Sequence, residues 1–308
     1  MKNLFIFLVF PGFFFTAIVG MMARWLDRKI TARLQWRVGP PWYQSFADIV
    51  KLLGKETIIP RDCHRSAFIL APILGISGMI VASGMLGAVS LNPARGFTGD
   101  LIVMICLLAV PSLALFIGGL ASRNPLASIG ASREMKLMVA YGIPFILAAF
   151  TPAAKAGLTA ALGDILAYQR VRGDLLWSPS GILAFIAALV CMQARLGFVP
   201  FDSPEAETEI EAGPLTEYSG ILLAIFTLMK MMLVVIVPFF LLILFAGGVR
   251  LHGWGIPSSA LRYLFILIIA ILVKNTNPRL RTDQALRLFR GPVTVVAAAG
   301  VVLALLGH

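Results

Sequence analysis

A cluster of carboxylates is the part of this sequence whose residue types and spacing could do chemistry. The stretch 199–220 contains six of the fifteen Asp and Glu residues, and these are Asp202, Glu205, Glu207, Glu209, Glu211 and Glu217. The segments on both sides are apolar enough to lie in a bilayer. Carboxylates crowded at a membrane boundary repel one another and are poorly solvated, so the pKa of some of them rises. Such acids can exchange protons near neutral pH.

We predict a short helix within this acidic stretch. Ser203 and Pro204 suit the first positions of a helix, and the Gly-Pro at 213–214 suits its end. The carboxylates that would share a helical face are Glu205 with Glu209 and Glu207 with Glu211. In an extended segment all four would point the same way. Both geometries predict close acid pairs with coupled titration, and a solvated loop with ordinary pKa values remains the alternative.

Two more charged residues lie inside or at the edge of apolar runs. Lys230 stands twelve residues into the run that follows the acidic stretch, and Glu134 opens another run. A lysine at that depth needs a carboxylate or a water-filled cavity, unless its side chain extends back to the membrane surface. We therefore add Glu134 and Lys230 to the candidate coupling residues. The three cysteines and three histidines are scattered, so we expect no metal site, cofactor site or catalytic triad in this chain.

The composition predicts an all-α polytopic membrane protein. Of 308 residues 59% are apolar and 13% are charged, and the mean hydropathy is +0.89. Soluble domains are about a quarter charged, and the alternating segments of a transmembrane barrel are absent. We predict one membrane domain, 1–308, with about eight spans. These are 3–22, 66–90, 101–121, 134–153, 181–199, 218–246, 258–274 and 291–307.

The basic residues predict the orientation of these spans. Eighteen of the 26 Lys and Arg residues lie in or beside four loops, and these loops are about 23–65, 122–133, 200–217 and 275–290. Basic loops stay in the cytoplasm, so we place both termini outside a prokaryotic cell membrane and the acidic stretch inside. The net charge of +11 is then a consequence of topology, which excludes nucleic acid as the partner.

The first cytoplasmic loop is expected to lie along the membrane surface. Apolar residues at helical spacing from Trp42 to Leu53 predict an amphipathic interfacial helix. Basic residues before it contact either lipid phosphates or a cytoplasmic partner. The candidate docking residues, including one acid near the C-terminus, are Arg28, Lys29, Arg33, Arg37 and Asp283.

Four blocks of the sequence resemble the subunit 1 family of respiratory complex I and its hydrogenase relatives. They run from Asp27 to Pro40, from Ala47 to Asp62, from Pro200 (Pro-Phe-Asp-Ser-Pro-Glu-Ala-Glu-Thr-Glu) to Gly220, and from Asn277 to Gln284. The likeness covers essentially the whole chain, in order. In one branch of the family this subunit forms much of a quinone chamber. In the other it anchors a nickel–iron hydrogenase module and couples it to ion transport.

Several positions resemble the hydrogenase branch more than the quinone branch. Gly197-Phe-Val199 precedes Pro-Phe-Asp where the quinone branch has Asn-Arg-Ala, and Gly39-Pro-Pro-Trp42 replaces Gly-Pro-Asn-Arg. Lys230 stands where a Glu is usual, and the segment 130–135 is also similar to the hydrogenase branch.

The resemblance implies a membrane anchor and ion-coupling subunit of an energy-converting hydrogenase. Its nickel–iron centre and iron–sulfur clusters are expected in cytoplasmic partners, namely the hydrogenase large and small subunits and iron–sulfur subunits, with antiporter-like subunits in the membrane. The acidic stretch, Glu134 and Lys230 would couple electron transfer to H⁺ or Na⁺ movement. A quinone-site subunit of complex I is the alternative. A stand-alone secondary transporter is a third possibility, although no internal repeat supports it.

Overall fold

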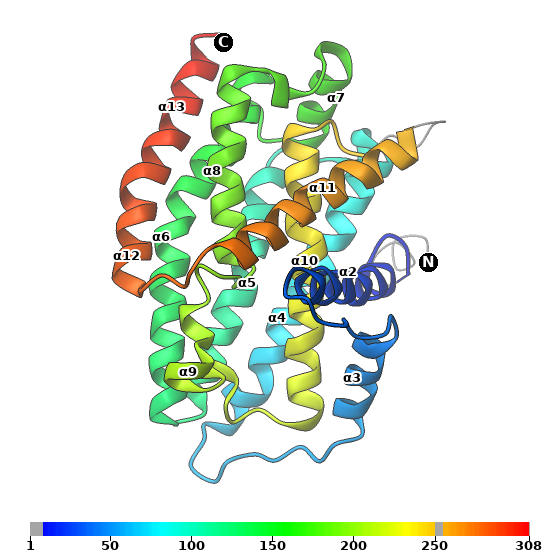
Figure 1. The fold of residues 1–308 in the computed structure, drawn as a ribbon. Coiled ribbons are helices and arrows are strands. Elements are labelled where there is room, and N and C mark those ends of the chain that lie inside the picture. The colour runs from blue at the N-terminus through cyan, green and yellow to red at the C-terminus, as the bar shows by residue number, and fades with distance from the viewer. Residues whose placement is uncertain (1–8, 250–254, 308) are drawn as a thin grey trace.

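The structure, a computed structural model, describes residues 9–249 and 255–307, apart from the side chains of Glu207 and Thr208. Every regular element within these ranges is a helix (Figure 1). The main helices are α2 (Phe13–Leu34), α3 (Gln44–Leu53), α4 (Arg65–Leu91), α5 (Asp100–Ala121), α6 (Pro125–Lys155), α7 (Leu162–Arg172), α8 (Pro179–Arg195), α10 (Gly220–Phe245), α11 (Gly255–Thr276), α12 (Thr282–Leu288) and α13 (Thr294–Leu305).

Six of these helices are long and apolar enough to cross a bilayer. They are α4, α5, α6, α10, α11 and the continuous helix Thr282–Leu305 that contains α12 and α13. Helix α8 is also apolar but has 17 residues. The all-α, polytopic membrane class is therefore confirmed. Of the first predicted span, residues 3–8 lie outside the described part of the chain.

Three helices extend beyond the predicted boundaries between spans and loops. Helix α2 continues through the expected boundary at residue 22 to Leu34, α6 begins at Pro125 instead of residue 134, and α12 occupies part of the expected loop 275–290. A hydropathy profile ends a span at the first charged residues. The helix itself can continue through charged residues when their side chains form ion pairs or hydrogen bonds. Asn124 and Pro125 mark the true start of α6, because the Asn side chain caps the helix and Pro occupies its first turn.

Helix α10 forms the centre of the molecule. Its large side chains are buried on every face, including Phe226, Met232, Phe240 and Phe245, as expected for a helix that is apolar all round. It packs against α2 and α4, while α4, α5, α6, α8 and α13 form the surrounding bundle. The crossing of α2 over α10 requires Gly20, because a Cβ there would lie 2.6 Å from the carbonyl oxygen of Met231.

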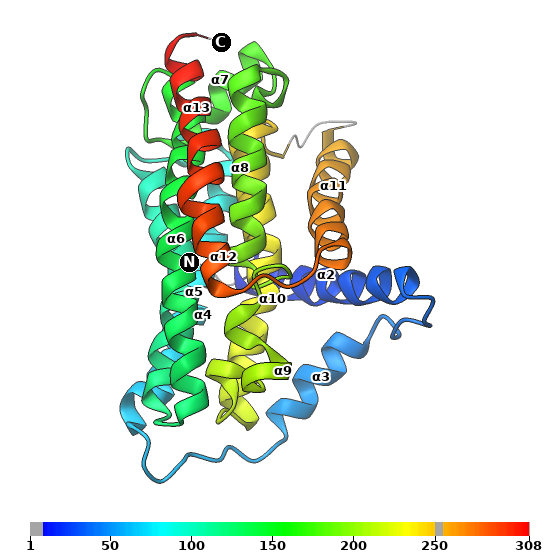
Figure 2. The same cartoon turned by 60° about the vertical axis from the view of Figure 1, so that its left-hand side comes forward.

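Helix α2 lies across the bundle, and α3 leads from its far side toward the end of the bundle where α9 lies (Figure 2). The predicted amphipathic helix is thus present as α3. Arg28 holds it against α2 through Asp48, at 2.7 Å, and Gln44 also donates to Asp48. Burial raises the pKa of Asp48, but these two hydrogen bonds outweigh it and hold that pKa below its usual value.

Helix α11 lies on the outside of the bundle and is held by a buried ion pair. The Asp27 carboxylate of α2 is fully buried, and Lys274 Nζ lies 2.9 Å from both of its oxygens. The Lys274 ammonium also lies 4.9 Å from the centre of the Phe198 ring. This contact joins α2, α11 and the segment that leads into the acidic stretch.

Replacing Asp27 by Ala should lower the stability of the chain more than any surface change. Removing one partner of a buried pair costs about 3–5 kcal/mol, and the partial exposure of Lys274 places the expected loss near the lower limit. The double variant Asp27→Asn, Lys274→Met should recover much of it. Denaturation of the purified protein in detergent measures both. Equal stability of the single and double variants would count against the ion pair as the anchor.

Candidate functional site

The acidic stretch folds into three short turns instead of one helix. It contains η3 (Ser203–Glu205), α9 (Glu207–Ile210) and η4 (Gly213–Leu215). Ala206, which is extended, separates η3 from α9, and the backbone at Glu211 is left-handed, with φ 54°. The stretch also turns back on itself so closely that a Cβ on Gly213 would lie 2.0 Å from the carbonyl oxygen of Pro204. The prediction of a single helix is therefore wrong.

This fold directs the carboxylates to separate partners. Four carboxylates have a cationic or amide partner: Glu205 with Lys230, Glu209 with Arg133 at 2.6 Å, Asp202 with Arg279 at 2.8 Å, and Glu217 with the Asn124 amide at 2.6 Å. Glu211 is exposed, and the side chain of Glu207 lies outside the described residues. The sequence predicted that these acids would pair with one another. In the structure they contact cations or an amide instead.

Two of the contacts answer questions that the sequence left open. Lys230 has a carboxylate partner, Glu205, and does not extend away from the protein. The hydrogen bond from Arg133 and its positive charge hold the pKa of Glu209 below its usual value. Glu209 therefore stays ionised at neutral pH and is suited to hold the stretch against α6.

A small polar cavity lies beside the Lys230–Glu205 pair. It offers about 30 Å³ of space, and its charged lining is Glu134, Arg195, Asp202, Glu205 and Lys230. A cavity needs about 10–15 Å³ to hold one water, so this one has room for one or two. The structure thus brings Glu134 of α6 and Lys230 of α10 to one water-sized site, although the two residues are not paired with each other.

Arg195 is a member of this site that the sequence reasoning missed. It is 5% exposed at the end of α8, and its guanidinium lies 4.3 Å from the centre of the Phe145 ring. Its Nε and Nη1 atoms have no hydrogen-bond partner in the structure. Unsatisfied buried donors are rare, and water in the cavity would satisfy them. An arginine that ends an apolar run is usually a membrane anchor, so the sequence carries no signal for this role.

Ser112 and Tyr141 complete the buried polar group. The Ser112 hydroxyl of α5 lines the cavity and lies 3.0 Å from the Tyr141 hydroxyl of α6. The Tyr141 ring lies 5.2 Å from the Arg195 guanidinium. The cavity is therefore connected by polar side chains from α5, α6, α8 and α10.

The predicted docking residues have mixed surroundings. Arg28 is paired with Asp48, and Lys29 donates to the carbonyl oxygen of Gly39 at 3.4 Å, so both contribute to holding α3 and its preceding loop. Arg33 and Arg37 are exposed, and Arg37 lies beyond the end of α2. Asp283 is exposed at the start of α12, far along the chain from these basic residues.

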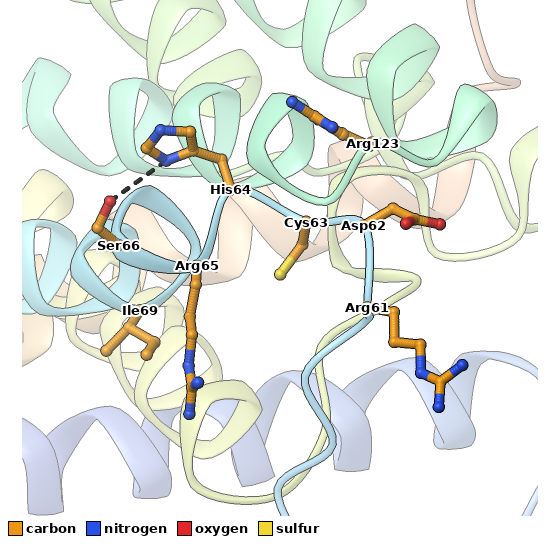
Figure 3. A pocket seen from close by; sticks show the side chains of 8 residues that line it. All are labelled: Arg61, Asp62, Cys63, His64, Arg65, Ser66, Ile69 and Arg123. Atoms are coloured by element: carbon orange, nitrogen blue, oxygen red, sulfur yellow. Dashed lines mark hydrogen bonds between the residues drawn. The ribbon is translucent and has the colours of Figure 1, made fainter.

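A basic surface covers the end of the bundle formed by the loop before α4 and the turn between α5 and α6. A cleft of about 730 Å³ there is lined by three arginines, Arg61, Arg65 and Arg123, and by one carboxylate, Asp62, around Cys63 and His64 (Figure 3). The backbone N–H of His64 donates to the Ala121 carbonyl, at 2.9 Å, and joins the two segments. The three guanidinium groups point in different directions in Figure 3. They therefore form a broad positive surface, unlike a site that converges on one small anion.

The sequence matches the model of one protein family along almost its whole length. The family is described as NADH dehydrogenase, and the match covers residues 6–305. One subunit of the NADH-quinone oxidoreductase of Geobacillus kaustophilus (strain HTA426) is 32% identical over 84% of this chain and 80% of its own length. The corresponding subunit of the Bacillus cytotoxicus enzyme is 28% identical over 98% of this chain and 94% of its own length.

A solved structure is also similar. It is a chain of the membrane-bound sulfane sulfur reductase, an archaeal respiratory membrane complex, with a TM-score of 0.88 and 29% identity over 99% of this chain and 100% of that one. Within the described residues no group of three or more His, Cys, Asp or Glu side chains could hold a metal ion. The family match, the relatives and the apolar helices lead to one conclusion. This chain belongs to the NADH dehydrogenase subunit 1 family and is a membrane subunit of a complex-I-like oxidoreductase.

Proposed function

We propose that this chain is the membrane anchor and ion-coupling subunit of a complex-I-like nickel–iron hydrogenase. The observation that carries the proposal is the Lys230–Glu205 ion pair beside Glu134 in a cavity of water size. A cation and two carboxylates around one or two waters can pass a proton when the charge nearby changes. The redox centres belong to cytoplasmic partners. The role of this chain is to move an ion when electron transfer in those partners changes the nearby charge.

In this mechanism the acidic stretch transmits the change. Arg133–Glu209 ties the stretch to α6, and Asp202–Arg279 ties it to the segment between α11 and α12. Electron transfer in the partner alters the charge above the stretch and shifts Glu205 relative to Lys230. Glu134 and the cavity water then exchange a proton, or Na⁺, with the path into the membrane. The exposed Glu211 adds negative charge to the stretch, and the Asn124 amide holds Glu217.

The NADH-quinone oxidoreductase relatives are named for quinone reduction, and the polar cavity does not fit a quinone. Ligand pockets for organic molecules measure about 300–1,000 Å³, whereas this cavity offers about 30 Å³ and is occupied at one side by the Lys230–Glu205 pair. A larger cavity of about 270 Å³ lies between α2, α4, α10 and α11, but none of the described residues that line it is charged. Its hydroxyls on Thr16 and Ser83 donate to helix carbonyls. We derive no quinone step.

A second candidate is the same coupling role in a complex that reduces sulfur compounds. The full-length similarity to a chain of the sulfane sulfur reductase favours it. The ion-coupling site is the same in both candidates, because the electron acceptor binds to the partner subunits.

Assays of the purified complex distinguish the acceptors. The hydrogenase proposal predicts hydrogen evolution with a reduced viologen dye and no NADH-dependent quinone reduction. Polysulfide reduction without hydrogen evolution would favour the second candidate. Quinone reduction that is sensitive to quinone-site inhibitors would contradict both.

Changing Glu205 to Gln should uncouple the complex. Lys230 then loses its countercharge, and because both side chains are about a third exposed, breaking the pair costs less than for a buried one, about 1–2 kcal/mol. Because about 1.4 kcal/mol is a factor of ten, we expect ion pumping by proteoliposomes to fall about tenfold. Dye-linked hydrogenase activity, which belongs to the partners, should stay near the wild-type level.

The matched control for this change is Glu56→Gln, an exposed carboxylate outside the acidic stretch. It should leave pumping unchanged. Equal pumping by Glu205→Gln and the wild type would refute the role of the ion pair.

The basic surface of Arg61, Arg65 and Arg123 suits the docking of an acidic partner subunit. All three side chains are exposed and make no ion pair with another described residue. Arg33 in the last turn of α2 and Arg37 beyond it are also exposed and remain separate candidates for docking. Under the predicted orientation this end of the bundle faces the cytoplasm.

Reversing these three charges should release the hydrogenase module. We expect the triple change of Arg61, Arg65 and Arg123 to Glu to leave the membrane subunit folded while hydrogenase activity appears in the soluble fraction. Binding of the wild-type module should weaken as salt rises. The control is a triple change to Glu at exposed arginines remote in sequence from this surface, namely Arg95, Arg170 and Arg172. Retention of the module by the first variant would argue that docking lies elsewhere.

A further inference from the structure

A second charged cleft opens between α6, the acidic stretch and the start of α12. Its volume is about 620 Å³, and its charged lining residues are Arg133, Lys136, Glu209, Arg279, Arg281 and Asp283. Figure 1 shows α12 beside α6 and above α9. The cleft is therefore close to the level at which the apolar helix Thr282–Leu305 begins.

The cleft carries positive charge beyond what its ion pairs neutralise. Two of its four cations are held by the pairs to Glu209 and Asp202 described above. Lys136 and Arg281 form no ion pair with any described residue, and Asp283 is the remaining carboxylate in the lining. One positive charge is therefore in excess, which favours an anionic ligand.

A buried hydroxyl adds an independent observation. Ser203 is 4% exposed, lines this cleft, and has no hydrogen-bond partner for its Oγ atom in the structure. A buried polar atom without a partner is rare. The Oγ atom itself is closed off from the cleft in this structure, so a phosphate oxygen there would satisfy it once the side chain rotates toward the cleft.

The helices above the cleft present apolar side chains to their surroundings. On α6 the exposed residues recur at helical spacing, with Val139, Ile143, Ile146 and Phe150 following Lys136 on one face. Helix α13 packs against α6 and exposes Val295, Val302 and Leu305. Lys136 therefore marks the polar end of a face suited to lipid chains.

We propose that this cleft binds the headgroup of an anionic phospholipid, whose acyl chains lie along the apolar faces of α6 and α13. Lys136, Arg281 and the Ser203 hydroxyl would donate to the phosphate, as basic pockets between membrane helices do for acidic lipids. A transmembrane helix from a partner would cover the apolar faces but leave these three donors unsatisfied. The inference concerns the lipid alone and does not depend on the electron acceptor.

Because Ser203 begins η3, the bound headgroup would also hold the acidic stretch at its first turn. The lipid would then stabilise the arrangement in which Glu205 meets Lys230. The lipid site and the coupling site would then be connected through the acidic stretch. Each site can still be tested separately.

Native mass spectrometry of the purified complex, titrated with phosphatidylglycerol, tests the proposal. Each Lys or Arg near an anionic lipid contributes about 1 kcal/mol, or about fivefold in affinity. The double variant Lys136→Ala, Arg281→Ala should therefore bind this lipid about 25-fold more weakly. The variant Arg287→Ala, an exposed arginine of α12 outside the cleft, is the matched control and should bind as the wild type does.

Four further results test the proposal. Phosphatidylcholine should lose less affinity than phosphatidylglycerol in the double variant, because its choline cation offsets the charge of the phosphate that both lipids carry. Inorganic phosphate at the same concentration should not displace phosphatidylglycerol, and displacement would show a simple anion site instead. Equal binding of phosphatidylglycerol by the double variant and the control would overturn the proposal. So would efficient crosslinking of a Lys136→Cys variant to a partner subunit in place of lipid.

Discussion

The lysine inside α10 is the constraint on which the rest of the site depends. Lys230 lies in the most enclosed of the six long apolar helices, and an ammonium at that depth requires a countercharge. Glu205 supplies it only because the acidic stretch folds back between α6 and α10. The close approach of the acidic stretch to α6 also requires glycine. Gly130 of α6 approaches the carbonyl oxygen of Pro204 so closely that a Cβ would lie 2.8 Å from it.

From this pair a chain of ion pairs extends over the cytoplasmic side of the proposed topology. Asp202 is held by Arg279, and Lys274, five residues before Arg279, is held by Asp27 of α2. Under the proposed mechanism, a displacement of the acidic stretch would be transmitted both to α11 and to the crossing helix α2 through these pairs. The Lys230–Glu205 and Lys274–Asp27 contacts are partly buried, so salt screens them less than it screens the exposed Asp202–Arg279 pair. That property suits a subunit that transmits mechanical or electrostatic change.

The sequence predicts the class of fold because apolar runs are long and numerous, and it identifies the acidic stretch because carboxylates between such runs are costly. It also finds Lys230 and Glu134 for that reason. It does not predict which cation meets which acid, since Glu205 and Lys230, or Asp27 and Lys274, are far apart in the chain. It does not identify Arg195, because an arginine that ends an apolar helix usually serves as a membrane anchor. It misplaces the start of α6, because hydropathy gives the charges at residues 133 and 134 more weight than the cap at Asn124.

The measurement that tests the central claim most directly is redox-difference infrared spectroscopy of the intact complex. If the Lys230–Glu205 pair responds to electron transfer, reducing the peripheral module will change a carboxylate band in the wild type, and that change will be absent from Glu205→Gln. A difference spectrum in which no carboxylate band responds to reduction, or in which the same band responds in Glu205→Gln, would contradict the account.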